Sequence, residues 1–528
     1  MKKAQVFIFV ILVSAGAIFI HSQQEVVLSI KDGMPVIPLA LPDFISQSSS
    51  QEIKELGKDL HQIVADDLNY SRIFQLLPES HYSYIRPLNA KKIFFKDWES
   101  IQATLLLVGI ISESENKDFL FEGKIYDVKS SRFIFGKRYQ SAKSLLRLVA
   151  HKMADEVMNI YGERPVFTSK VIFISDRDGN NELYMMDYDG QNQTRLTFNK
   201  IIDYMPAWSA DGKQIAYTSY RGTEAGLYLY NPYEGVRKEV ISEGTNFAPA
   251  FSLNGKKLAF CSTAEEGNSE IYVANSDGTN IKRLTFNTAI DTSPSWSPNS
   301  REIAFTSDRG GTPQIYIMDA EGSNVRRASF GGSYHDAPAW SPTGDRIAYV
   351  SRVDQIFDIY VLNLRTNKII KLTESNARNE SPCWSPDGRH LIFSSNLNGT
   401  VQLYTIDYDE AAQILGDSMS SAGGKLEPDS ILEHPDHGVG LNVALGIQEE
   451  AVGSSSGFDV LDLTSHLAIE ERFPVLTPNS QKVGPIAHCD PNCVDEGLIL
   501  GLFGTVVRDD LAAILEPHGL STQRPPQL

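Results

Sequence analysis

The sequence predicts a multidomain chain in which an α+β N-terminal domain is followed by an all-β six-bladed β-propeller and an appended acidic C-terminal tail. The first observation is a repeated phrase, an aromatic residue followed by Ser and a short turn, whose copies lie 43 to 45 residues apart and begin at Trp208, Phe251, Trp296, Trp340 and Trp384. A second observation is a set of six β-rich triplets, such as Ile303-Ala304-Phe305, each followed by an aliphatic-Tyr pair, such as Ile315-Tyr316. A period of about 40–50 residues is typical of the four-stranded blades of a β-propeller, and six copies predict six blades.

Composition divides the chain into four segments. Residues 1–22 are predicted to be a signal peptide, because Met1-Lys2-Lys3 precedes a largely apolar run of fifteen residues over 6–20. That run is shorter than the about 20 residues of a membrane-spanning helix, although an uncleaved N-terminal anchor is the alternative. Residues 23–164 are predicted to form the α+β domain, residues 165–410 the propeller, and residues 411–528 a partly disordered tail of unknown role.

Helices and strands are mixed in the N-terminal segment. Apolar residues recur at helical spacing in two stretches, which predicts amphipathic helices over 53–68 and 145–161. Between them, β-rich stretches predict strands over 104–111, 119–128 and 132–139. Such a mixture indicates a separate α+β domain.

The repeated aromatic residues are predicted to pack between blades. In Ser385-Pro386-Asp387-Gly388, Pro and Gly occupy the positions that favour a type I turn, which places Trp384 on the short innermost strand before the turn. An aromatic ring there fills the wedge between neighbouring blades and buries about 150–250 Å². The residues expected to serve packing rather than chemistry are Trp208, Phe251, Trp296, Trp340 and Trp384.

Ring closure is not specified by the repeats. The first blade begins at its second strand, near Val171, and the sixth lacks an outer strand after Tyr404. A closed ring would therefore complete one blade with strands from both ends of the chain. Residues 473–480 resemble the phrase around Trp296 and could supply the missing strand, but we expect this similarity to arise by chance.

The charge of the chain argues against nucleic acid as a partner. Its 528 residues carry a formal net charge of -18, with a pI of about 5.1, whereas binding to phosphate backbones requires a basic surface. Residues 411–528 contain 17 acidic and 5 basic residues and so account for -12 of this charge. The four cysteines are too sparse for a disulfide framework, and Cys261 and Cys383 are expected to be small core residues.

Motifs that could carry chemistry are weak. The sequence around Ser455 matches the G-x-S-x-G nucleophile elbow, so a secreted propeller-containing serine hydrolase or peptidase is the alternative function, yet the flanks lack the strand and helix that an elbow requires. His488, Cys489 and Cys493 have the spacing of zinc ligands without an evident fourth ligand, and residues 176–180 lack the Gly of a calcium loop. A ligand or metal along the propeller axis is a third, weaker alternative. No catalytic residue, metal or cofactor is expected.

Beyond the repeats themselves, several motifs occur in a distinctive order. They include the Trp-Ser-Pro-Asp-Gly phrase at Trp384, residues 175–187 of the first blade, and Trp98 and residues 154–157 of the N-terminal segment. Together with the signal peptide and the six blades, these motifs resemble the TolB family, the periplasmic propellers of the Tol-Pal system. The likeness covers residues 1 to about 408.

This resemblance implies a non-enzymatic scaffold in the periplasm, where the chain arrives after signal-peptide cleavage. Such a scaffold would link the peptidoglycan-associated lipoprotein Pal to the inner-membrane TolA complex, with other outer-membrane proteins as further partners. The implied roles are outer-membrane integrity, cell division and protein import. The resemblance implies no cofactor, no nucleic acid partner and no membrane span in the mature protein.

The resemblance also implies two partner-binding regions. The Pal-type contacts fall on loops that precede the blade aromatics, at Asp203, Tyr204, Thr245, Asn246, Ala248, Asp291, Thr292, His335, Asp336, Asn379 and Glu380. Thr245, Ala248 and Thr292 are the strongest individual expectations, although Thr245 stands where the family has a His. The TolA-type contact falls on the mature N-terminus, whose alternating apolar residues suit pairing with an exposed sheet edge. Its residues are Glu25, Val26, Val27, Leu28, Ile30 and Asp32. Solvated turns, and a strand docked on its own domain, are the alternatives for these regions.

Overall fold

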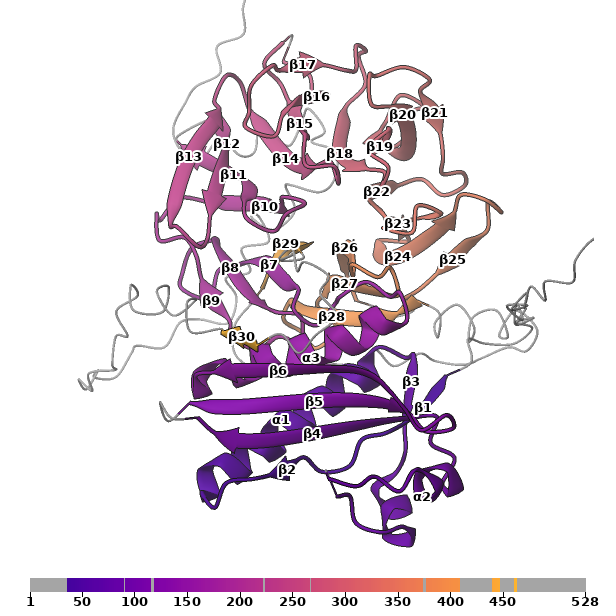
Figure 1. The fold of residues 1–528 in the computed structure, drawn as a ribbon. Coiled ribbons are helices and arrows are strands. Elements are labelled where there is room, and N and C mark those ends of the chain that lie inside the picture. The colour runs from indigo at the N-terminus through magenta and orange to yellow at the C-terminus, as the bar shows by residue number, and fades with distance from the viewer. Residues whose placement is uncertain are drawn as a thin grey trace, which may run out of the picture.

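The chain folds into two packed bodies, an α/β N-terminal domain and a six-bladed β-propeller, which Figure 1 shows side by side. The computed structural model describes residues 36–408, except for 90, 115–117, 222–223, 266 and 374–376, together with two strands at Val439–Gly446 and Val460–Asp462. This architecture confirms the predicted fold class. The signal peptide, residues 25–32, Ser455 and the candidate zinc ligands lie outside the described residues. Among the residues described, no helix is both long and apolar enough to cross a membrane.

The N-terminal domain is a mixed sheet with two long helices on one face. Its strands follow the order β3 (Phe74–Leu76), β1 (Ile37–Ala40), β4 (Leu105–Glu113), β5 (Phe119–Asp127), β6 (Arg132–Ser141) and β30 (Val460–Asp462), and β2 (Ile45–Ser46) pairs with β4. The long helices α1 (Gln51–Tyr70) and α3 (Leu146–Ile160) contact each other and match the two predicted helices closely. The short helices are α2 (Phe95–Ser100) and 3₁₀ turns at Glu79–Tyr84 and Lys143–Leu145.

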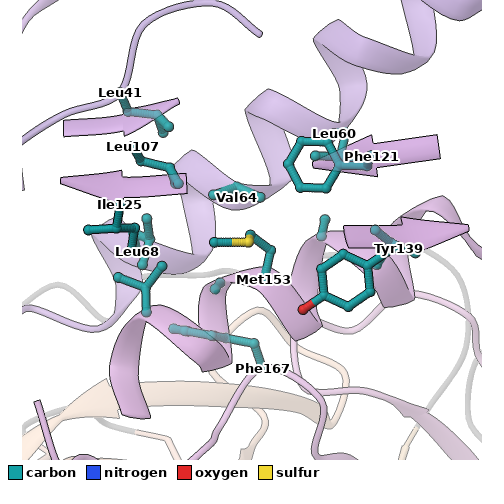
Figure 2. Packing of buried hydrophobic residues seen from close by; sticks show 14 of the residues in the cluster. Leu41, Leu60, Val64, Leu68, Leu107, Phe121, Ile125, Tyr139, Met153 and Phe167 are labelled. Atoms are coloured by element: carbon teal, nitrogen blue, oxygen red, sulfur yellow. The ribbon is translucent and has the colours of Figure 1, made fainter. Parts of the chain in front are cut away.

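Both long helices turn their apolar faces to the sheet and form one core (Figure 2). Leu60, Val64 and Leu68 lie one helical turn apart along α1 and are fully buried, as the periodicity of the sequence predicts. Met153 of α3 packs against Gly123 of β5, where a Cβ would lie 2.4 Å from the Met153 sulfur. Glycine at this position therefore permits the close approach of helix to sheet.

Each propeller blade is an antiparallel sheet, and in blades 2 to 6 the strands follow one another in chain order from the central axis to the outside. Among the described residues, blades 2 to 5 have four strands each and blade 6 has three. Blade 2 contains β10 (Asp203–Trp208), β11 (Ile215–Arg221), β12 (Glu224–Asn231) and β13 (Val236–Ile241). Blade 3 contains β14 (Asn246–Phe251), β15 (Lys257–Ser262), β16 (Glu270–Asn275) and β17 (Lys282–Arg283). Blade 4 contains β18 (Asp291–Trp296), β19 (Glu302–Ser307), β20 (Gln314–Asp319) and β21 (Arg326–Arg327). Blade 5 contains β22 (His335–Trp340), β23 (Arg346–Val353), β24 (Ile356–Asn363) and β25 (Ile369–Lys371). Blade 6 contains β26 (Asn379–Trp384), β27 (His390–Ser395) and β28 (Gln402–Asp407).

The ring is closed by a strand from the C-terminal part of the chain. β29 (Val439–Gly446) pairs with β7 (Lys170–Ser175), and blade 1 continues outward with β8 (Glu182–Asp187) and β9 (Thr194–Arg195). β29 also lies beside the innermost strands of blades 2 and 6. Blade 1 therefore lacks an innermost strand of its own, as the repeats indicate. The place considered for residues 473–480 is taken by β29.

The repeated Trp residues lie at the ends of innermost strands, between neighbouring blades. Trp296 belongs to a buried cluster with residues of both blade 3 and blade 4. Its indole N–H donates to the carbonyl of Ala250 in the preceding blade at 3.0 Å, and Trp384 donates to the carbonyl of Ala339 in the same way at 3.0 Å. These rings join blades through both packing and a hydrogen bond, whereas Phe251 offers packing alone and is only half-buried.

Candidate functional site

The five innermost strands of blades 2 to 6 begin with the same unusual backbone turn. A residue other than glycine takes a positive φ of 50 to 55° directly before a Pro, and the strand register shifts at that point. The residues in this conformation are Met205, Ala248, Ser293, Ala337 and Ser381. Such a conformation costs about 1–3 kcal/mol and is found most often at functional sites. We call the loops that enter these strands, together with the first residues of the strands, the loop face.

The predicted Pal-type residues all lie on the loop face, but the structure divides them into two groups. Four are partly exposed and can touch a partner: Tyr204, Thr245, Ala248 and Thr292. Seven are buried: Asp203, Asn246, Asp291, His335, Asp336, Asn379 and Glu380. Most of the eleven residues are enclosed by their own propeller, so they cannot all touch a partner directly.

The buried acidic residues hold the loop face in shape. Asp203 accepts hydrogen bonds from the Ser219 hydroxyl at 2.5 Å and the Asn199 amide at 2.8 Å. Asp336 accepts from the hydroxyls of Thr306 at 2.7 Å and Tyr334 at 2.9 Å. Burial raises the pKa of both carboxyl groups, while these hydrogen bonds act in the opposite direction. Each donor lies in another strand or loop, so the carboxylates fix the positions of neighbouring segments.

Burial also shifts the pKa values of two further side chains on the loop face, Glu380 and His335. Glu380 forms an ion pair with Arg378 at 2.8 Å, and burial raises its pKa. Burial, followed by the positive charge of Arg327, lowers the pKa of His335 to about 4. His335 is therefore neutral near pH 7.

Three phenylalanines on the same loops are much more exposed than the predicted residues. Phe198, Phe286 and Phe330 have relative exposures of 63%, 71% and 65%. Each follows a repeated phrase of the type Arg-Leu-Thr and lies under the guanidinium of that phrase, with Arg195 at 4.6 Å and Arg283 at 4.8 Å from the ring centres of Phe198 and Phe286. These three residues are not among the predicted site residues, although an aromatic residue directly after a repeated strand motif is a signal in the sequence that could have found them.

The loop face lies at the opposite ends of the strands from the N-terminal domain. The domain contacts the turn that ends the innermost strand of blade 6, where Arg164 donates to the carbonyl of Pro386 at 3.5 Å. It also pairs Glu163 with Arg389 at 2.8 Å. In blade 1 the N-terminal domain encloses Tyr188. This residue directly follows β8 and belongs to the core of the N-terminal domain. The described residues of the N-terminal domain therefore leave the loop face uncovered.

One group of side chains has the composition of a metal site. Ligand atoms of His151, Asp187 and Asp189 lie within 4.8 Å of one another. Lys170 already pairs with Asp187 and Arg147 with Asp189, and the Asn192 amide donates to Asp187 at 2.7 Å. Two cationic side chains thus neutralise the two carboxylates, so the group is an ion-pair network across the domain boundary rather than an open cation site.

Sequence models of two domains match this chain. The model of the TolB beta propeller domain matches residues 157–357 and 334–429, and the model of the TolB amino-terminal domain matches residues 28–134. The propeller model alone spans more than half of the 528 residues.

Known relatives agree with these matches. The chain is 33% identical over 292 residues to the Protein TolB homolog of Chlorobium chlorochromatii, covering 55% of this chain and 65% of the relative. It is 32% identical over 254 residues to the Tol-Pal system protein TolB of Desulfosudis oleivorans, covering 47% of this chain and 57% of the relative. Both alignments span less than two thirds of the relative. The crystal structure of TolB from Acinetobacter baumannii has the same fold, with a TM-score of 0.61 at 24% identity over 78% of this chain and 96% of that chain.

Proposed function

Because the chain belongs to the TolB family, we propose that it is a protein-binding scaffold of the Tol-Pal envelope system and not an enzyme. The observation that carries this proposal is the match of both TolB domain models, in order, along a chain whose described N-terminal residues contact the propeller at the ends of the strands opposite to the loop face. A relative at 32% identity bears the name Tol-Pal system protein TolB. The described residues of the loop face support contact with a protein, since they combine partly exposed side chains with exposed aromatic rings.

In this proposal the protein works in the periplasm between two partners. The loop face binds a Pal-like peptidoglycan-associated lipoprotein, and the mature N-terminal stretch at residues 25–32 binds TolA. By connecting the two, the scaffold supports outer-membrane integrity and cell division. Other outer-membrane proteins are further partners of the same kind.

The contact residues on the loop face follow from exposure. A partner can bury only what is accessible, so Tyr204, Thr245, Ala248 and Thr292 provide the direct contacts, and the seven buried residues shape the surface beneath them. Phe198, Phe286 and Phe330 extend this surface outward. An aromatic ring offers about 150–250 Å² of surface to bury, which makes these three rings the largest apolar contributions available.

Replacing Thr292 with Arg is expected to weaken Pal binding by at least about tenfold, because a long charged side chain then stands in the centre of a contact that has to exclude water. Isothermal titration of the purified protein with Pal measures the change. The matched control is Leu253→Arg, since Leu253 is 49% exposed in the turn after β14, at the opposite ends of the strands. Equal affinities of both variants would count against the loop face, and the absence of any complex at micromolar concentration would count against the proposed function.

Deleting residues 25–32 is expected to abolish binding to TolA and to leave binding to Pal within about twofold, because the proposal assigns the two partners to different parts of the chain. Parallel titrations of the deleted and full-length proteins with each partner separate the two contacts. Loss of both affinities together would show that the assignment of the N-terminal stretch is wrong.

A further inference from the structure

The N-terminal domain and the propeller meet in a buried polar interface that neither partner site uses. We call it the seam, and its central residues are Asp67, Tyr70, Arg72 and His151 of the N-terminal domain with Tyr188, Asp189, His390 and Asp407 of the propeller. At one end of the seam, Asp67 accepts a hydrogen bond from the Tyr188 hydroxyl at 2.5 Å, and its other oxygen lies 2.8 Å from Nδ1 of His151. These contacts join helices α1 and α3 to blade 1.

At the other end of the seam, a histidine of blade 6 is enclosed by the N-terminal domain. His390 is 4% exposed, and its ring stacks on the ring of Tyr70 at a centroid distance of 4.0 Å and an angle of 17°. Neither ring nitrogen of His390 has a hydrogen-bond partner among the described residues. Separation of the domains would uncover this ring, since Tyr70 ends α1 and belongs to the opposite domain.

The charges around His390 balance one another without it. Asp407 at the end of β28 lies 3.7 Å from Nε2 of His390 and equally 3.7 Å from Nε of Arg72, which follows α1. The turn before β27 contributes Asp387 and Arg389, 3.8 Å apart. From the N-terminal domain, Glu163 pairs with Arg389 at 2.8 Å, and Arg164 reaches the same turn at the carbonyl of Pro386. Three carboxylates, of Asp387, Asp407 and Glu163, thus lie with three guanidinium groups, of Arg72, Arg389 and Arg164, so a protonated His390 would add one positive charge to a group that is already balanced.

We propose that the seam is an acid-sensitive latch: the domains stay docked while His390 is neutral, and acidification favours their separation because the uncovered His390 takes up a proton. The latch does not depend on the partners proposed above. It rests on the stacked imidazole, whose nitrogens accept and donate no hydrogen bond among the described residues, and on the charge balance around it.

The direction of the effect follows from the shifted pKa of His390. Burial lowers this pKa from its ordinary value of 6.5, the nearby Asp387 and Asp407 act in the opposite direction, and Arg72 and Arg389 lower it further. Above about pH 6.5 both the docked and the uncovered His390 are neutral, so docking is unaffected. As the pH falls below that value only the uncovered form binds the proton, and the opening equilibrium rises by about tenfold per pH unit until the lowered pKa is reached.

The other end of the seam has a different pH dependence. Burial lowers the pKa of His151, but the hydrogen bond and charge of Asp67 more than offset this effect and raise it. Docking that depends on a charged His151 is therefore complete at low pH and is lost only as the pH rises through that raised value. Burial raises the pKa of Asp67, which opposes the His390 effect in acid. The contribution of His390 is consequently measured as a difference between two proteins.

Hydrogen-exchange mass spectrometry of the full chain tests the latch between about pH 5 and pH 7.5, after correction for the intrinsic exchange rates. In peptides that contain Tyr188 and His390, opening of the wild type relative to His390→Phe is expected to increase by about tenfold per pH unit below about pH 6.5. Phe keeps an aromatic ring against Tyr70 and removes the titrating group. His390→Leu provides the same comparison if the Phe variant does not fold.

His335→Phe is the matched control, because His335 is also a buried histidine, at 4% exposure, but lies on the loop face away from the seam. It is expected to keep the wild-type pH dependence at the seam. The latch is refuted if His390→Phe shows the same pH dependence as the wild type, or if His335→Phe loses that dependence to the same extent.

Discussion

Ending the chain after residue 409 is expected to remove cooperative unfolding of the propeller or to lower its stability by about 5 kcal/mol or more, which is comparable to the whole stability of a typical domain. The truncation deletes β29, the innermost strand of blade 1, which pairs with β7 and lies beside the innermost strands of blades 2 and 6. Without it, β7 has an unpaired edge at the axis and the ring is open on one side. The buried Val171, Ile172 and Phe173 of β7 then lose part of their cover.

Urea unfolding followed by circular dichroism, together with calorimetry, measures this effect. A chain that ends after residue 450 is the control, because it keeps β29 and deletes β30 with the rest of the tail. It is expected to unfold like the full-length propeller. If the chain ending at 409 melts at the same temperature as the one ending at 450, β29 does not close the ring.

The blades could be predicted from the sequence because their signals are local and repeated. The turn after Trp384 and the strand triplets recur five or six times, so that an error in one copy is corrected by the others. The two long helices were predicted for a similar reason. Leu60, Val64 and Leu68 define a helical face within a single stretch of chain, whatever that face packs against.

Ring closure could not be predicted because its partners are far apart in the sequence. β29 pairs with β7 across more than 260 residues, and its only local signal is a short alternation of apolar residues at Val439, Leu441, Val443 and Leu445. Four alternating positions between glycines resemble many loop segments. The acidic composition of residues 411–528 pointed instead to a tail separate from the propeller.

Which residues of the loop face are exposed also could not be predicted from the sequence, because burial there depends on contacts between strands that are distant in the sequence. Asp203 and Asp336 look like solvated loop residues, but they are enclosed because Ser219 and Thr306, on neighbouring strands, donate hydrogen bonds to them. The seam has the same property. The sequence around Tyr188 indicates an ordinary strand-ending turn, and only the tertiary structure shows that its ring enters the core of another domain.

Replacing Tyr188 with Ala is expected to destabilise the protein by about 3–5 kcal/mol, because it leaves a cavity in the core of the N-terminal domain and removes an aromatic contact across the seam. The Tyr188 ring is 8% exposed and packs against the rings of Phe167 at 5.4 Å and Tyr70 at 5.3 Å. Tyr188→Phe keeps that ring and loses only the hydrogen bond to the Asp67 carboxyl group, with an expected cost of about 1.5–3 kcal/mol.

Chemical denaturation of both variants separates the packing of Tyr188 from its hydroxyl, and Tyr84→Ala serves as the control. Tyr84 is 82% exposed, so its replacement is expected to change the free energy of unfolding by no more than about 0.5 kcal/mol. Tyr188 follows a strand of the propeller, but its ring packs in the core of the N-terminal domain. Tyr188→Ala should therefore also make the N-terminal domain unfold before the propeller. A single unchanged transition in Tyr188→Ala would mean that this ring does not couple the two domains.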